Sequence, residues 1–225
     1  MANAIPLSGF DNVMPNYQMI KALVRAVPDV VIEPDHTVMI SPDEGAMSRC
    51  INYSSSLGLD IGMFYKRRDY STIVNGKNPI LEHKYLGQDL EGKDVIIVDD
   101  MISSGGSLLD VATQLKTIYK AKRVFNFATF GLFTDGFKEF DEAYEKGIID
   151  KIFTTNLVYR KPEIYKKPWY VEVNMCKYVS YIIDTLNHDN TISELLNPDK
   201  RIAALLEKHK ADLADQGQMA ITFDN

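Results

Sequence analysis

The chain is organised around the segment Val95-Ile96-Ile97-Val98-Asp99-Asp100-Met101-Ile102-Ser103-Ser104-Gly105-Gly106-Ser107. Its four leading apolar residues are typical of a parallel strand that is covered on both faces. Two carboxylates follow this strand directly, and a run of small residues comes after them. Backbone amides of small residues can close around an anion just before a helix begins. We therefore expect a strand over residues 95–98 that delivers two acids into an anion-binding loop.

A helix is predicted immediately after this loop, over residues 106–119. Its apolar residues recur at helical spacing, at Leu108, Val111, Ala112, Leu115, Ile118 and Tyr119. A strand end, a loop of small residues and a helix N-terminus in succession favour a negatively charged ligand. The pattern indicates a site for a phosphorylated sugar or a nucleotide.

Strands and helices alternate along the rest of the chain, which predicts an α/β fold with a parallel sheet and helices on both faces. Residues 70–80 show no periodicity and predict a long loop of the kind that often forms a lid beside a site. The other expected strands are residues 37–41, 61–66, 84–86, 124–130, 152–155 and 169–173, and the other expected helices are residues 16–27, 44–57, 137–146, 176–186 and 199–213.

Composition narrows the class of protein. The chain has 225 residues, of which 45% are hydrophobic, and this is enough for a sizeable core. Its net charge of −6 argues against a broad nucleic-acid surface. The two cysteines, Cys50 and Cys176, lack a metal-binding spacing and fit a reducing compartment. We find no signal peptide and no apolar run near the ~18 residues that span a bilayer, so we expect a cytoplasmic protein without membrane or nucleic-acid partners.

The paired acids and the loop resemble the phosphoribosyl-diphosphate (PRPP) signature of type I phosphoribosyltransferases and ribose-phosphate pyrophosphokinases. The resemblance implies a phosphoribosyltransferase-like fold. It also implies that the acids hold the ribose hydroxyls, directly or through Mg²⁺, while the loop holds the 5-phosphate. The implied ribose 5-phosphate site comprises Asp99, Asp100, Ser103, Ser104, Gly105, Gly106 and Ser107.

Three further segments resemble pyrophosphokinases, and simple phosphoribosyltransferases lack this set in this order. Residues 39–46 resemble the pyrophosphate loop, which this likeness assigns to Asp43, Glu44 and Gly45. Residues 60–68 resemble the strand that opens the flexible catalytic loop, and residues 123–134 resemble the strand and turn after the ribose-phosphate helix. The likeness covers roughly residues 5 to 200. It implies an enzyme that makes PRPP from ATP and ribose 5-phosphate.

The residue types suit that chemistry. Transfer of a diphosphoryl group brings two polyphosphates together, so cations must offset their repulsion. Lys66 and Arg68 are the expected catalytic cations. Oxygen ligands are those that Mg²⁺ prefers, and we expect them from Asp43, Asp99 and Asp100.

The chain also departs from the family pattern. Pyrophosphokinases usually carry an acid at the position of Ser103, a second glycine at that of Ala46 and a histidine at that of Phe130. A full enzyme of this family has two similar α/β halves, and the chain resembles the C-terminal one. We therefore expect residues 1–30 to adjoin an absent N-terminal half, residues 31–190 to form the phosphoribosyltransferase-like domain and residues 191–225 to form a helical extension.

Two alternative functions stay open. The chain can be a phosphoribosyltransferase that consumes PRPP, which the loop Ser103-Ser104-Gly105-Gly106-Ser107 favours. It can also be a non-catalytic regulatory subunit of a pyrophosphokinase. In that family the adenine lies between subunits, which implies a homo-oligomer.

Overall fold

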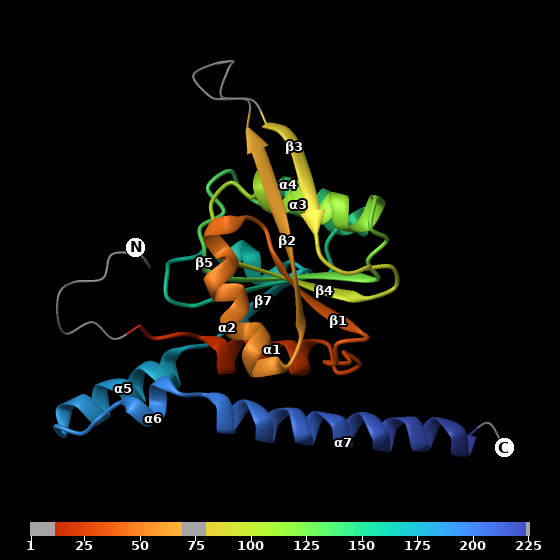
Figure 1. Cartoon of the computed structure of the whole chain (residues 1–225). Helices are drawn as coiled ribbons and strands as arrows, with labels where there is room; N and C mark the ends of the chain where they lie inside the picture. The colour runs from red at the N-terminus through yellow and green to blue at the C-terminus, as the bar shows by residue number, and fades with distance from the viewer. Residues whose placement is uncertain (1–11, 69–79, 224–225) are drawn as a thin grey trace.

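The computed structural model describes residues 12–68 and 80–223 (Figure 1). The strands are β1 Thr37–Ser41, β2 Asp60–Arg68, β3 Ile80–Leu86, β4 Asp94–Ile102, β5 Arg123–Gly131, β6 Lys151–Thr155 and β7 Tyr170–Val173. The helices are α1 Asn16–Ala26, α2 Met47–Leu57, α3 Gly106–Thr117, α4 Lys138–Glu145, α5 Cys176–Asn187, α6 Ser193–Leu196 and α7 Asp199–Phe223, with short 3₁₀ helices η1 Glu44–Ala46 and η2 Pro162–Lys166.

The strands form one sheet in the order β3-β2-β1-β4-β5-β6-β7. Every neighbouring pair from β2 to β7 is parallel, which confirms the predicted α/β class. The exception is β3, which pairs antiparallel with β2. Our expectation of parallel pairing was wrong for this strand, because it returns directly beside β2 instead of crossing over a helix.

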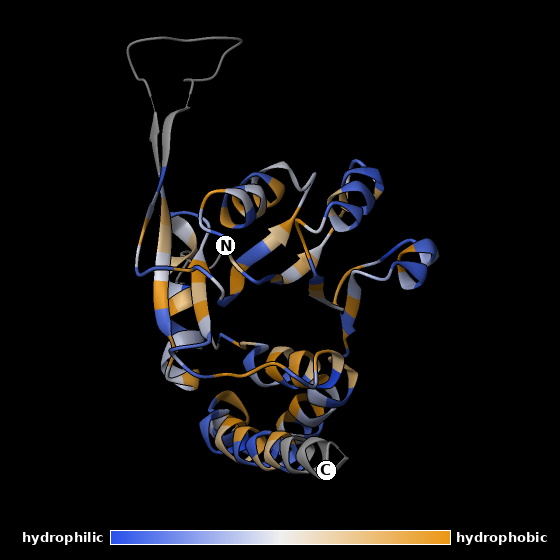
Figure 2. Cartoon of the chain, turned by 90° about the vertical axis from the view of Figure 1, so that its right-hand side faces the viewer, coloured by the Kyte–Doolittle hydropathy of each residue, from blue (hydrophilic) through white to orange (hydrophobic). Residues whose placement is uncertain are grey.

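Helices cover both faces of the sheet, as predicted (Figure 2). Helices α3 and α4 pack on one face, whereas α1 and α2 pack on the other, with α5 and α7 beyond them. The apolar run of β4 divides between these two layers. Val95 and Ile97 enter the first core, and Ile96 and Val98 enter the second. This two-sided burial explains why the run is continuous and does not alternate with polar residues.

Strand β4 is longer than the sequence predicted. It continues through both acids to Ile102, because its pairing with β5 extends to Ile102 opposite Gly131. The acids were expected just after the strand, but Asp99 and Asp100 lie in its last part. Strands β2 and β3 are also longer than predicted, and together they form a ribbon that projects beyond the other strands (Figure 1).

Helix α7 forms the outermost layer on the side of α1 and α2 (Figures 1 and 2). It continues to Phe223, beyond the predicted end at residue 213. Ile202 is fully buried, and His209 places its Nε2 2.7 Å from the carbonyl oxygen of Val30, to which it donates a hydrogen bond. These contacts fix the helix against the core.

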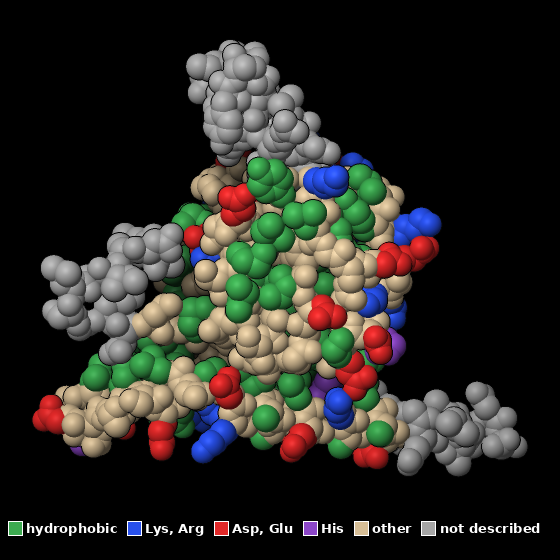
Figure 3. Space-filling model, viewed as in Figure 1, with side chains coloured by type: hydrophobic (Ala, Val, Ile, Leu, Met, Phe, Trp, Pro, Cys, Tyr) green, Lys and Arg blue, Asp and Glu red, His purple; other side chains and the backbone are tan. Residues whose placement is uncertain are grey.

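The surface facing the viewer in Figure 3 carries acidic and basic side chains that are interspersed. Among the described helices, none combines the length and the apolar character needed to cross a membrane.

Candidate functional site

The parallel pairing of β1 with β4 brings two of the predicted segments together. Asp43 follows the end of β1, while Asp99 and Asp100 lie near the end of β4. Parallel neighbours end at the same edge of a sheet, where ligands of open α/β folds bind. The negative charges of Asp43 and Asp100 both act on the Asp99 carboxyl group. The three predicted metal ligands therefore share one edge of the sheet.

Asp99 is the most strongly perturbed acid at this edge. Its pKa is raised to about 6, first by burial and then by the hydrogen bond and charge of Asp100 and the charge of Asp43. Its Oδ1 accepts a hydrogen bond of 2.7 Å from the backbone amide of Asp100, which opposes the rise. Excess negative charge thus gathers here, as is typical of a site that takes a cation or a hydroxylated ligand.

Asp100 is more exposed than Asp99 and faces a cation that the sequence did not predict. Arg49 of α2 places Nη2 3.6 Å from Oδ2 of Asp100, and its side chain is only 16% exposed. The signal in the sequence was the position of Arg49 in the first turn of the helix that follows the Asp43 turn. Only the packing of α2 over the strand ends turns that position into a contact with Asp100.

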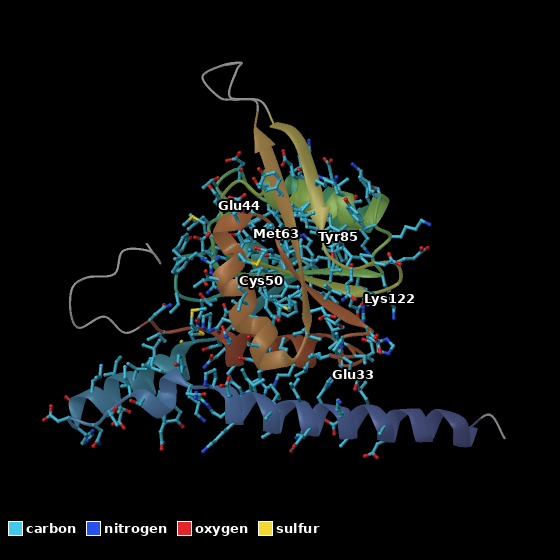
Figure 4. All side chains as sticks on the ribbon, in the orientation of Figure 1. Glu33, Glu44, Cys50, Met63, Tyr85 and Lys122 are labelled. Atoms are coloured by element: carbon cyan, nitrogen blue, oxygen red, sulfur yellow. The ribbon has the colours of Figure 1, made fainter. Side chains whose placement is uncertain are left out.

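The predicted pyrophosphate loop forms a tight turn. Asp43 caps η1, since its Oδ1 accepts a hydrogen bond of 3.1 Å from the amide of Ala46. Glu44 and Gly45 are exposed, and Glu44 lies where the chain enters α2 (Figure 4). Ala46 is 2% exposed. Its methyl group, which replaces the usual glycine of the family pattern, therefore lies in the protein interior.

The predicted phosphate loop joins β4 to α3. Gly105 has φ +96°, and a Cβ atom there would lie 2.1 Å from the Phe140 ring, so only glycine fits. The carbonyl of Ser103 accepts a hydrogen bond of 3.0 Å from the amide of Thr134, which ties the loop to the segment after β5. The loop backbone is therefore held in place from both sides.

The groups that this loop presents are free for a ligand. Ser103, Ser104, Gly106 and Ser107 are exposed. Within the described part of the chain, no protein group hydrogen-bonds to the three serine hydroxyls. The first amides of α3 also lack intrahelical acceptors. Hydroxyls and amides at a helix N-terminus make a suitable anion site.

The two predicted catalytic cations lie in β2. Lys66 pairs with His83 and Arg68 with Ile80 across the ribbon, beyond the last pairing of β2 with β1. Their side chains lie outside the described residues. The predicted lid, residues 70–80, also lies outside them apart from Ile80, which begins β3.

The fit of the site to Mg²⁺ follows from its acids. Among the described residues, no group of three or more Asp, Glu, His or Cys side chains converges as a ready metal cage. Mg²⁺ at phosphate sites uses one or two carboxylates, with water and substrate oxygens completing its shell. Asp99 and Asp100 are such a pair of carboxylates, and burial is the first cause that raises the pKa of Asp99.

We compared the sequence of the chain with those of known proteins. The sequence of residues 17–135, just over half of the chain, matches the family described as the phosphoribosyl transferase domain. A ribose-phosphate pyrophosphokinase from Vibrio parahaemolyticus is 29% identical over 164 residues, which cover 72% of this chain and 49% of that protein. One from Pyrococcus abyssi is 33% identical over 134 residues, which cover 60% of this chain and 43% of that protein. The chain spans about half the length of these curated relatives.

The fold has a counterpart among solved structures. Phosphoribosylpyrophosphate synthetase from Mycobacterium smegmatis superposes with a TM-score of 0.60 at 20% identity, covering 77% of this chain and 51% of that chain. The matched domain and the curated relatives both include the segment that carries Asp99, Asp100 and the loop after them. The chain belongs to the phosphoribosyl transferase domain family, and it is similar to the C-terminal part of proteins named ribose-phosphate pyrophosphokinase.

Proposed function

We propose that this chain carries the ribose 5-phosphate and pyrophosphate sites of a ribose-phosphate diphosphokinase, which makes PRPP from ATP and ribose 5-phosphate. The observation that carries the proposal is the juxtaposition at the end of β4. The acids Asp99 and Asp100 lie directly before a loop with free amides and hydroxyls, and the Asp43 turn lies beside them on β1.

Each part of the site has a role in the proposal. The loop from Ser103 to Ser107 binds the 5-phosphate, and Asp99 and Asp100 bind the ribose hydroxyls or Mg²⁺. The turn at Asp43 receives the diphosphoryl group. Bound Mg²⁺ would offset charge on the phosphate oxygens. In the reaction, the 1-hydroxyl oxygen of ribose bonds to the β-phosphorus of ATP while the bond from that phosphorus to the α-phosphate oxygen breaks; AMP leaves, and the hydroxyl proton is released to solvent.

The proposal assigns charge stabilisation to β2. Lys66 and Arg68 meet the transferring phosphates, since β2 runs past β1 at the same edge of the sheet as Asp43. Lysine makes a point contact with one phosphate oxygen, whereas arginine can grip two. Removing such a charge-stabilising donor typically lowers kcat by about 10²–10³-fold.

Two other functions have some support. The matched phosphoribosyl transferase domain and the Ser-Ser-Gly-Gly-Ser loop favour an enzyme that transfers ribosyl from PRPP to a base. The contact of Arg49 with Asp100, together with Ser103 in place of the usual acid, favours a subunit that binds ligand without catalysis.

Binding of ribose 5-phosphate with Mg²⁺, measured by calorimetry, tests the site. We expect the unmodified chain to bind, and we expect Ser104→Asp and Asp99→Ala to abolish binding, because one adds a negative charge to the anion loop and the other removes a sugar ligand. Ser55→Asp is the matched control, since it adds the same charge to an exposed position of α2. Equal affinity in all four proteins would reject the site.

Activity assays separate the three functions. Release of AMP from ATP and ribose 5-phosphate supports the diphosphokinase. Turnover only with PRPP and a nucleobase assigns the chain to the phosphoribosyltransferases. Binding of ribose 5-phosphate without either turnover, even when a second unit that positions ATP is present, assigns it to the non-catalytic subunits. Holding both substrates in place contributes up to about 7–11 kcal/mol to such reactions, so we expect little AMP release by this chain unless a second unit positions ATP.

A further inference from the structure

A cavity lies away from the acids and the phosphate loop. It measures about 820 Å³ and is bordered by α1, the end of β7, α5 and the start of α7. None of the residues that line it belongs to the candidate site described above. All of these helices lie on the α1 and α2 side of the sheet (Figure 1). Its lining is distinctive in both charge and aromatic content.

Four cations line this cavity: Lys21 and Arg25 from α1, Lys177 from α5, and Arg201 from α7. Within residues 12–68 and 80–223, none of them forms an ion pair with a carboxylate. The one acid of the lining, Glu172, is already engaged, since its Oε2 lies 3.0 Å from Nη2 of Arg160. In a chain of net charge −6, this local surplus of positive charge is not a consequence of composition.

The cations are close enough to repel one another. The pKa of Lys21 is lowered by partial burial in the first place, and then by the charges of Arg25 and Lys177. Like charges that face a shared cavity are unfavourable unless an anion joins them. The repulsion therefore marks the cavity as one that a negatively charged ligand would stabilise.

Aromatic rings contact three of these cations, Lys21, Lys177 and Arg201. The Arg201 guanidinium lies 5.3 Å from the centroid of the Tyr17 ring and 5.9 Å from that of Tyr178. The Nζ atom of Lys21 lies 5.6 Å from the centroid of the same Tyr17 ring. Arg201 also donates a hydrogen bond of 3.0 Å to the carbonyl of Leu195. Such contacts restrict long side chains before a ligand arrives, which reduces the entropy lost on binding.

We infer that this cavity is a second anion site, which binds a small molecule with two or more linked phosphoryl groups. Three or four cations match the charge of a diphosphate better than that of a single phosphate. The volume also exceeds what one phosphate needs, and the Tyr181 ring, which is 49% exposed and contacts Lys177, offers a surface for an attached organic group. A nucleoside diphosphate and inorganic pyrophosphate share the chemistry that the cavity recognises.

Calorimetry with inorganic pyrophosphate, without Mg²⁺, tests the inference. The experiment uses Ser104→Asp as the background, so that binding at the phosphate loop does not contribute. We expect saturable binding, weaker binding of inorganic phosphate, and a fall in affinity with added salt because the contacts are electrostatic. A nucleoside diphosphate that binds more tightly than pyrophosphate would identify the organic source.

The decisive variant is Lys21→Gln/Arg25→Gln in the same background, with Lys138→Gln/Lys146→Gln at the two ends of α4 as the control of equal charge change. We expect the first pair to weaken pyrophosphate binding by at least about tenfold, a change of roughly 1.4 kcal/mol, and the control pair to leave it unchanged. Thermal unfolding verifies that both are folded. Equal affinity in the two pairs, or no saturable binding at all, would overturn the inference. Concentration-dependent association lost only in the first pair would instead assign the cavity to contact between copies.

Discussion

The Arg49 guanidinium of α2 lies 3.6 Å from the Asp100 carboxylate of β4. This contact links the helix after the Asp43 turn to the strand that carries the paired acids. Arg49 is mostly buried, whereas the Asp100 side chain is 53% exposed. The guanidinium therefore contributes positive charge at the edge of the sheet where we propose that anions and Mg²⁺ bind together.

Replacing Arg49 should affect cation and anion binding in opposite directions. Arg49→Ala leaves Asp100 without its partner, so we expect Mg²⁺ to bind about two- to fivefold more tightly, the scale of an exposed ion pair, and ribose 5-phosphate to bind more weakly. Calorimetric titrations with each ligand measure both changes. Arg49→Lys keeps the charge and should behave like the unmodified chain. Weaker Mg²⁺ binding in Arg49→Ala would contradict the prediction.

Asp99 should make Mg²⁺ binding depend on pH. Its pKa is raised from 3.8 to about 6, so protonation competes with Mg²⁺ as the pH falls through about 6. We expect the affinity for Mg²⁺ to decrease from pH 7 to pH 5 and this decrease to be absent in Asp99→Asn. A titration series at several pH values provides the measurement.

The same group should influence stability with a defined sign. Because the folded-state pKa of Asp99 lies above its ordinary value, its favourable contribution is present below about pH 4 and is lost as the pH rises through about 6. Without Mg²⁺, the gain in the free energy of unfolding that Asp99→Asn produces should therefore be larger at pH 7 than at pH 4. Urea unfolding at the two pH values tests this, and a larger gain at pH 4 would be the wrong sign.

Two adjacent glycines of the phosphate loop should respond differently to alanine. Gly105 has a positive φ and faces the Phe140 ring, whereas nothing lies within 4 Å of a Cβ atom at Gly106. Gly105→Ala should reduce the free energy of unfolding by about 1–3 kcal/mol through overpacking alone, with backbone strain in addition. Gly106→Ala is the matched control and should be neutral or slightly stabilising, since it begins α3. Urea unfolding of both variants measures the difference, and equal stability of the two would contradict the prediction.

The cations of β2 should be required for turnover but not for folding. In an assembly that releases AMP from ATP and ribose 5-phosphate, Lys66→Ala or Arg68→Ala should lower kcat by about two to three orders of magnitude. Arg67→Ala is the control, because it removes the same charge from the position between them in the chain. A loss in Arg67→Ala equal to that in the other two would show that only the overall charge of the triplet matters.

The order of elements could be predicted because each depends on local pattern. The apolar run of residues 95–98 and the helical spacing after Gly106 both appear in the structure. The ends of the strands could not be predicted in the same way. β4 continues through Asp99 and Asp100 because β5 supplies hydrogen-bonding partners there, and the sequence of β4 contains no information on that pairing.

The acid pair, the glycine-rich loop and the likeness to phosphoribosyltransferases and pyrophosphokinases were determined by the sequence alone, because they lie in short continuous segments. Contacts between distant segments were decided only by the tertiary structure. Packing of α2 brings Arg49 to Asp100, and packing of α4 places Phe140 where Gly105 must lack a side chain. Likewise, Lys21 and Arg201 line the same cavity only because α1 and α7 pack on the same side of the sheet. Burial and charge at such places depend on neighbours remote in the chain, which local patterns do not specify.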